Sequence, residues 1–237
     1  MNICASLKEK NMLKKIHQRL KYIGAKKLAT LKIGLKQSGF IAHHGLQRNG
    51  TNFLLLSLKQ IGCSVINEFD PPRNQPQHKH FRWYADKDLI PPVLSAEYGN
   101  TYAAKSILEL NTLCRFPSDT RHIVIYKAMK PALVSMLNWG LRCQWFATKE
   151  EALQALPAFK ADYEAYYEFW QNLATKEPHM VQLLSFEELL ANHLLIIERL
   201  KHLGFELDQT SIKLDFDEIP QSPKERRQVI VIDDVHL

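Results

Sequence analysis

The chain alternates short apolar runs with longer segments in which apolar residues recur every three or four positions. A bounded apolar run of about 4–8 residues is typical of a buried strand, and a helical period is typical of a helix packed on a core. The expected strands lie at 39–44, 63–67, 122–127 and 179–184. The expected helices lie at 52–61, 101–114, from about 131, 158–174 and 186–203. Strands separated by helices predict an α/β fold of three layers with a central, mostly parallel sheet.

Residues 1–37 differ from the rest of the chain in charge. They hold ten Lys/Arg and one acid, so they carry the net +6 of the protein and leave the remainder slightly acidic. Their apolar residues step by three to five positions, which predicts an amphipathic helix that breaks near Gly24. We therefore divide the chain into a basic helical extension, 1–37, and a single α/β domain, 38–237.

Three roles stay open for the extension: packing on the domain, lying on an anionic membrane surface, or touching nucleic acid. The acidic remainder and the lack of a recognised nucleic-acid module disfavour the third role, so we expect no nucleic-acid partner. The sequence has no run of eighteen apolar residues, no apolar signal region and no Cys-x-x-Cys pair. These features predict a cytoplasmic protein with reduced core thiols, which docks on the inner membrane face if the extension binds lipid.

A loop bounded by glycines follows the first expected strand and opens the first expected helix. It reads Gly45-Leu46-Gln47-Arg48-Asn49-Gly50-Thr51-Asn52. Strand, glycine-bounded loop and helix form a cradle for phosphate, because backbone N–H groups and the helix dipole favour an anion there. The lysine that a nucleoside-triphosphate loop carries after its second glycine is replaced by Thr51. The loop is therefore expected to bind phosphate without hydrolysing ATP or GTP, and the alternative is a plain turn.

A second candidate segment follows the strand 122–127. Lys127 closes the strand, and Ser135 comes eight residues later, in the first turns of the next expected helix. Open α/β sheets bind ligands at the carboxyl ends of their strands, so the pair is suited to a second phosphate. The alternative is that Lys127 is a solvated strand end and Ser135 an ordinary helix residue.

The order and spacing of these motifs resemble the sulfotransferases that use 3′-phosphoadenosine-5′-phosphosulfate (PAPS). That family has a loop like Pro-Lys-Ser-Gly-Thr-Thr-Trp, in which Arg48 stands at the lysine while Gly50 and Thr51 match. Its second motif, Arg-x-Pro followed by a serine, is similar to the segment from Lys127 to Ser135. The resemblance runs from about 40 to 207. The family's C-terminal glycine-rich nucleotide loop is absent, and its candidate replacement contains Arg226 and Arg227.

The resemblance implies a P-loop NTPase-like sulfotransferase core that takes PAPS as donor, needs no metal, and sulfates a hydroxyl of a glycan or glycolipid. Arg48 and the loop amides would hold the phosphosulfate end, and Lys127 with Ser135 would hold the 3′-phosphate. The implied cofactor-binding residues are Gln47, Arg48, Asn49, Gly50, Thr51, Asn52, Lys127 and Ser135.

Sulfuryl transfer to a hydroxyl also calls for a general base. His80 is the first candidate because its ordinary pKa lies near neutrality, and Glu68 is the second. The implied catalytic set is therefore Arg48, His80 and Glu68. Two other hypotheses stay open: a nucleotide kinase-like or other transferase on the same core, and a non-catalytic membrane-surface module that acts through residues 1–37.

Overall fold

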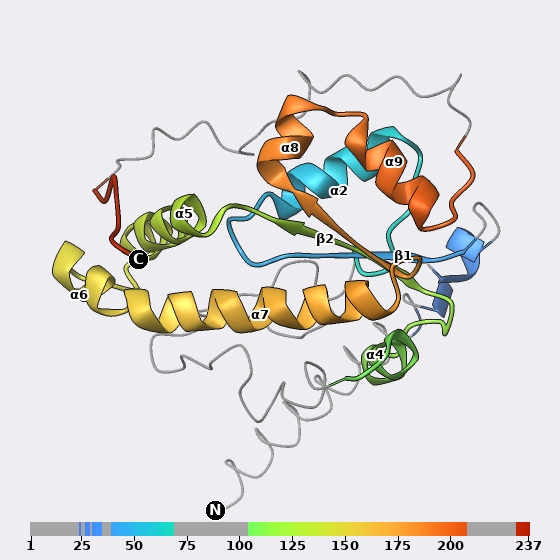
Figure 1. Ribbon diagram of the computed structural model, residues 1–237, viewed down its shortest axis with the longest axis horizontal. Coiled ribbons are helices and arrows are strands. Elements are labelled where there is room, and N and C mark those ends of the chain that lie inside the picture. The colour runs from blue at the N-terminus through green and yellow to red at the C-terminus, as the bar shows by residue number, and fades with distance from the viewer. Residues whose placement is uncertain (1–23, 25–26, 29, 35–38, 69–103, 208–230) are drawn as a thin grey trace, which may run out of the picture.

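The computed structural model describes residues 24, 27–28, 30–34, 39–68, 104–207 and 231–237. In these parts the chain forms a small parallel sheet with helices on both faces, an α/β arrangement (Figure 1). The strands are β1 (Ile41–His44), β2 (Arg121–Tyr126) and β3 (Val181–Ser185), in the order β1-β2-β3. Each strand lies within two residues of the range that the apolar runs predict. The expected α/β class with a parallel sheet between helices is confirmed.

Side chains of the strands alternate between two hydrophobic clusters, one on each face of the sheet. Ile123 and Ile125 pack with α2, α8 and α9, and Val124 between them packs with α4, α5 and α7. The helices are α2 (Thr51–Gln60), α4 (Ile107–Cys114), α5 (Met129–Arg142), α6 (Lys149–Gln154), α7 (Leu156–Lys176), α8 (Phe186–Ala191) and α9 (Leu195–His202). The sheet therefore lies between two helical layers.

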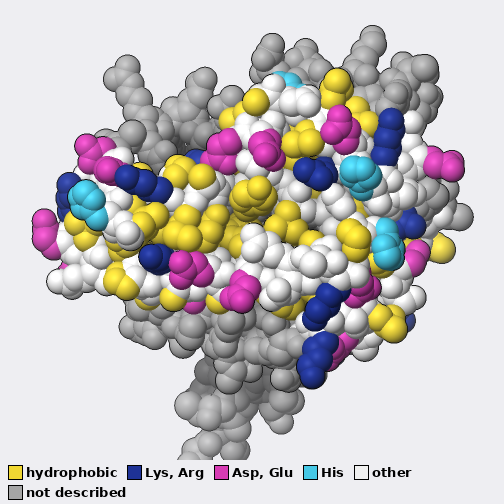
Figure 2. All heavy atoms as spheres, in the orientation of Figure 1, with side chains coloured by type: hydrophobic (Ala, Val, Ile, Leu, Met, Phe, Trp, Pro, Cys, Tyr) yellow, Lys and Arg dark blue, Asp and Glu magenta, His cyan; other side chains and the backbone are white. Residues whose placement is uncertain are grey.

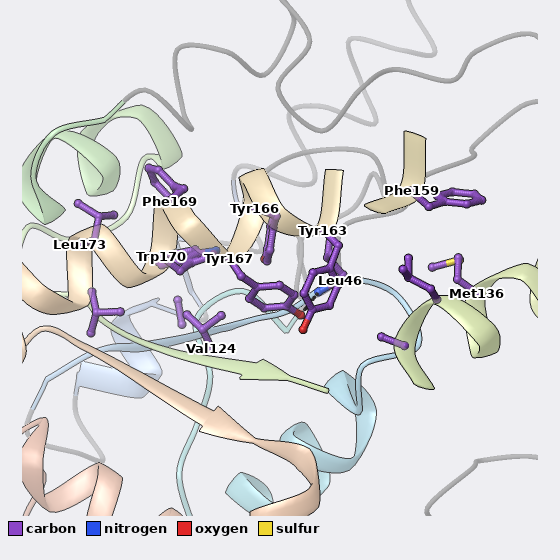
Figure 3. Packing of buried hydrophobic residues seen from close by; sticks show 14 of the residues in the cluster. Leu46, Val124, Met136, Phe159, Tyr163, Tyr166, Tyr167, Phe169, Trp170 and Leu173 are labelled. Atoms are coloured by element: carbon purple, nitrogen blue, oxygen red, sulfur yellow. Dashed lines mark hydrogen bonds between the residues drawn. The ribbon is translucent and has the colours of Figure 1, made fainter. Parts of the chain in front are cut away.

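Aromatic residues of α7 form much of one cluster. Tyr163, Tyr166, Tyr167 and Trp170 are all buried, and Figure 3 shows them directed from α7 toward β2. On the face seen in Figure 2, hydrophobic side chains gather across the middle, between α7 and α8, and charged side chains surround them.

The strand expected at 63–67 is wrong in extent. Among the described residues this segment forms one isolated bridge, between Val65 and Ile41. Beyond it the side chain of Asn67 replaces the backbone: its Oδ1 accepts from His43 N at 3.1 Å, and its Nδ2 donates to His43 O at 2.8 Å. An asparagine carboxamide presents the same donor and acceptor as a peptide unit, so it ends the strand by taking its hydrogen bonds.

The helix expected at 186–203 is also wrong, because it is two helices. The Asn192 backbone leaves the helical region, at φ −139°, and its Oδ1 accepts a hydrogen bond from Leu194 N at 3.1 Å. The side chain thus competes with the helical backbone and separates α8 from α9.

The C-terminal segment, residues 231–237, folds back on α5. The carboxamide of Asn138 makes three hydrogen bonds to the backbone of Val231 and Ile232, at 2.6–3.0 Å. Ile232 and Val235 are buried in the cluster that contains α5 and α7. Residues 229–230 lie outside the described parts.

The basic extension is described only in part. Residues 24, 27–28 and 30–34 are helical, with Ile33 buried in the core while Leu28 and Leu31 are exposed. The other residues of 1–37 lie outside the described parts, so its three roles stay open. Within the described ranges no helix has the length and apolar character needed to cross a bilayer. The prediction of core thiols is wrong for Cys143, which is exposed, whereas Cys63 and Cys114 are buried.

A chain of buried hydrogen bonds joins β1 to β2 and α4. His44 and His122 are both fully buried, and their Nε2 and Nδ1 atoms lie 2.9 Å apart. His122 Nε2 lies 2.8 Å from Asn111 Oδ1, and the Nδ2 of Asn111 donates to two backbone carbonyls. Because Asn111 Oδ1 is therefore an acceptor, we assign the His122 proton to Nε2 and the shared proton to His44. The pattern of apolar residues identified His44 only as a strand-end residue.

We expect this pair to make the fold sensitive to acid. Burial lowers the pKa of His122 to about 3, and burial, with His122 alongside, holds the pKa of His44 well below its ordinary value. The unfolded chain binds these protons below about pH 6.5, so stability is complete above that pH and is lost as the pH falls toward 3. Each pH unit should remove ~1.4 kcal/mol per histidine from the free energy of unfolding.

Urea unfolding at about pH 7.5 and about pH 5 measures this loss. The His44→Phe variant keeps a ring against Trp170 and should show a smaller loss. The His179→Gln variant changes an exposed histidine and should lose as much as the parent protein. Equal losses in all three proteins would contradict the assignment.

Candidate functional site

The loop between β1 and α2 passes too close to its neighbours for any residue but glycine at both ends. A Cβ on Gly45 would lie 2.7 Å from the Ile125 carbonyl oxygen. At Gly50, where φ is +84°, a Cβ would lie 2.4 Å from the ring of Phe186. Arg48 lies between them with φ +73°, a left-handed conformation that is uncommon for a residue with a Cβ and that clusters at functional sites.

A buried hydroxyl holds this loop against the sheet. The Tyr167 hydroxyl accepts a hydrogen bond from Leu46 N at 3.2 Å and donates one to Ile125 O at 3.1 Å. Figure 3 shows Tyr167 reaching from α7 toward Leu46 and β2. Burial raises the pKa of Tyr167 well above its ordinary value, so it remains a donor. The Tyr163 hydroxyl, one turn earlier, donates to Lys127 O at the end of β2.

The two candidate segments of the sequence meet at the carboxyl edge of the sheet. Arg48 Nε donates to Ser135 Oγ at 3.4 Å, which joins the loop to the second turn of α5. The Arg48 guanidinium also lies over the ring of Trp139, 4.9 Å from its centroid. Lys127 follows β2 directly, and its Nζ lies 5.6 Å from the centroid of Phe186. Residues 87 positions apart, Arg48 and Ser135, thus share one site with Lys127.

Burial and neighbouring cations disfavour the charged forms of Arg48 and Lys127. Burial lowers the pKa of the Arg48 guanidinium, and the positive charge of Arg142 lowers it further. Burial also lowers the pKa of Lys127, where Glu187 acts in the opposite direction and Arg48 in the same one. No carboxylate of the described residues lies within ion-pairing distance of Arg48. An anion placed between Arg48 and Lys127 would relieve this repulsion.

The other loop residues that the resemblance assigns to the cofactor are buried or half-buried. The side chains of Gln47, Asn49 and Thr51 are buried, so they do not present polar groups to solvent. The Asn49 amide donates to Leu46 O at 3.2 Å and closes the loop. The first bond of α2 runs from Leu54 N to Gly50 O, so earlier N–H groups have no partner within the helix. Asn52 is half-buried in that first turn.

Three buried polar atoms of the loop lack a partner among the described residues: Gln47 Oε1 and the two carboxamide atoms of Asn49. The Oε1 of Gln47 has no hydrogen-bond partner within the structure, although its residue is only 7% exposed. Such an orphaned acceptor is costly, so it points to a ligand or water that donates to it.

The catalytic candidates outside the loop are placed only in part. The carboxylate of Glu68 forms an ion pair with Lys59 in the last turn of α2. His80 lies outside the described residues, as do Arg226 and Arg227. The parts of the chain that the structure describes contain no group of three or more histidine, cysteine or acidic residues that could hold a metal.

Several residues of the site were missed by sequence reasoning. Trp139 supports Arg48, and Arg142 lies over the same ring at 5.4 Å. Glu187 accepts from Ala128 N and from Ser185 Oγ, each at 3.2 Å, and so holds the turn that carries Lys127. The spacing of Ser135, Trp139 and Arg142 along one face of α5 is a signal that could have indicated these contacts.

Comparisons with protein-family models, with curated proteins and with solved structures found no match.

We expect Gly50→Ala to destabilise the protein more than Gly62→Ala. Both glycines have left-handed backbones, at φ +84° and +78°, so alanine is strained by ~1–2 kcal/mol at either. At Gly62 the added Cβ meets nothing within 4 Å, whereas at Gly50 it meets Phe186. That overpacking should cost a further ~1–3 kcal/mol, which urea unfolding of the two variants measures. Equal losses would contradict the close packing of the loop.

Proposed function

We propose that the protein is a PAPS-dependent sulfotransferase that moves a sulfuryl group to a hydroxyl of a glycan or glycolipid. The observation that carries the proposal is the meeting of Arg48, Lys127 and Ser135 at the carboxyl edge of a parallel sheet. These are the positions at which the sequence resembles the phosphosulfate and 3′-phosphate motifs of that family. The repulsion of Arg48 by Arg142 and of Lys127 by Arg48, together with the unpartnered Gln47 acceptor, supports a bound ligand that is anionic and carries hydrogen-bond donors.

In the proposed reaction the acceptor oxygen attacks the sulfur of PAPS. The bond between sulfur and the 5′-phosphate oxygen breaks, and adenosine 3′,5′-bisphosphate leaves with the electron pair. Arg48 and the N–H groups at the start of α2 stabilise the negative charge that develops on the transferring group, and Lys127 with Ser135 orients the 3′-phosphate. Losing one such donor should cost ~2.7–4 kcal/mol of transition-state stabilisation.

The proton of the acceptor hydroxyl goes to a general base. His80 remains the first candidate, and residues 69–103, which contain it, lie outside the described parts. Glu68 is the weaker candidate, because its carboxylate is engaged by Lys59.

Calorimetric titration with adenosine 3′,5′-bisphosphate, with Mg-ATP as the control, tests the proposal. Micromolar binding of the bisphosphate without magnesium, together with weak binding of ATP, is the expected result. Tight binding of Mg-ATP alone would favour the kinase-like alternative. If neither nucleotide binds but liposomes do, the protein is a membrane-surface module that acts through residues 1–37.

Arg48→Ala and Lys127→Ala should each weaken binding of the bisphosphate at least tenfold. Each removes a charge-assisted hydrogen bond to phosphate, worth ~1.5–3 kcal/mol. Arg121→Ala is the matched control, because Arg121 begins the strand that Lys127 follows and its loss changes the net charge equally. Calorimetry should find nearly unchanged affinity in the control. Normal affinity in both site variants would refute the assignment of the site.

A further inference from the structure

The C-terminal segment forms a second wall beside the candidate site. An open pocket of about 400 Å³ lies between this segment and the first half of α5. Lys127, Lys130 and Ser135 line one side of it, and Asp233 and Asp234 line the other. Two of these residues, Lys127 and Ser135, belong to the site described above. A pocket that shares two residues with the proposed anion site is thus also lined by two carboxylates.

The position of these carboxylates is fixed by the residues around them. The Asn138 side chain holds the backbone of Val231 and Ile232 with three hydrogen bonds. Ile232 is fully buried and Val235 is 2% exposed, so both anchor the segment in the core. Asp233 and Asp234 lie between the two anchors and are exposed, which keeps them at the mouth of the pocket.

One of the two carboxylates is paired with a pocket lysine. Asp234 Oδ1 lies 2.8 Å from Lys130 Nζ, and both side chains are about half exposed, at 55% and 50%. The bond to Lys130 lowers the pKa of Asp234, so the carboxylate stays ionised. Because both groups remain in contact with water, the pair is weak and can be opened by a competing anion.

We propose that Asp234 is a built-in competitor for the anion site: it holds Lys130 until a phosphate-bearing ligand displaces it. This inference rests on the proposed function only in taking that ligand to be a phosphorylated nucleotide. On binding, the ligand phosphate takes Lys130, and the Asp234 carboxylate turns to solvent while the backbone stays anchored by Asn138. The pair therefore lowers the affinity of the pocket for the ligand without blocking it.

Calorimetric titration of Asp234→Asn with adenosine 3′,5′-bisphosphate and with inorganic pyrophosphate tests this role. An exposed ion pair is weak, so removing the competitor should tighten binding roughly two- to fivefold at low salt. Asp233→Asn is the matched control. It removes the same charge from the same wall of the pocket but leaves the ion pair between Asp234 and Lys130 intact. It should change the affinity less. Equal gains in both variants would overturn the proposal, since net charge alone would explain them.

The Lys130→Gln background completes the test as a double-mutant cycle. There Asp234→Asn should have no effect on affinity, because the lysine for which the carboxylate competes is gone. A gain that persists in this background overturns the proposal, and so does a failure of both ligands to bind the parent protein and Asp234→Asn. If pyrophosphate binds as well as the nucleotide and the cycle holds, the competitor role stands while the proposed sulfotransferase function fails.

Discussion

One buried hydroxyl, that of Tyr167, fixes the geometry on which the candidate site depends. It joins the loop after β1 to the backbone of β2, so a side chain of α7 sets how close the two strand ends lie. The contact at Gly45 leaves no space for a side chain there, and the loop is held firmly enough to keep Arg48 in a left-handed conformation. Arg48 then reaches Ser135 on α5 because both strands end at the same edge of the sheet.

The sequence predicts those parts of the molecule that depend on local patterns. The three strands are predicted by short apolar runs. The tight turn between the first strand and its helix is predicted by the two glycines of the loop. The same local patterns predict that Lys127 follows a strand and that Ser135 lies in the next helix, because each pattern depends only on neighbouring residues in the chain. Their meeting with Arg48 follows only once the strands are assumed to be parallel.

What the sequence does not predict involves pairs of residues that are distant in the chain. The bond between His44 and His122 joins residues of two different strands, and no spacing in the sequence indicates it. The predicted extents of two elements are also wrong, at Asn67 and at Asn192. At both, a carboxamide takes hydrogen bonds that the apolar pattern assigns to the backbone, and propensity cannot show which asparagine will do so.

The carboxamide of Asn67 has a consequence for the behaviour of the protein in concentrated solution. An open strand side presents a row of N–H and C=O groups on which another chain can add a strand, the first step of many aggregates. On the outer side of β1, Asn67 occupies both the N–H and the C=O of His43, and Ile66 N occupies the C=O of Ile41. The Asn67 side chain and the backbone of Ile66 thus block strand addition along this side of the described sheet without a further full strand.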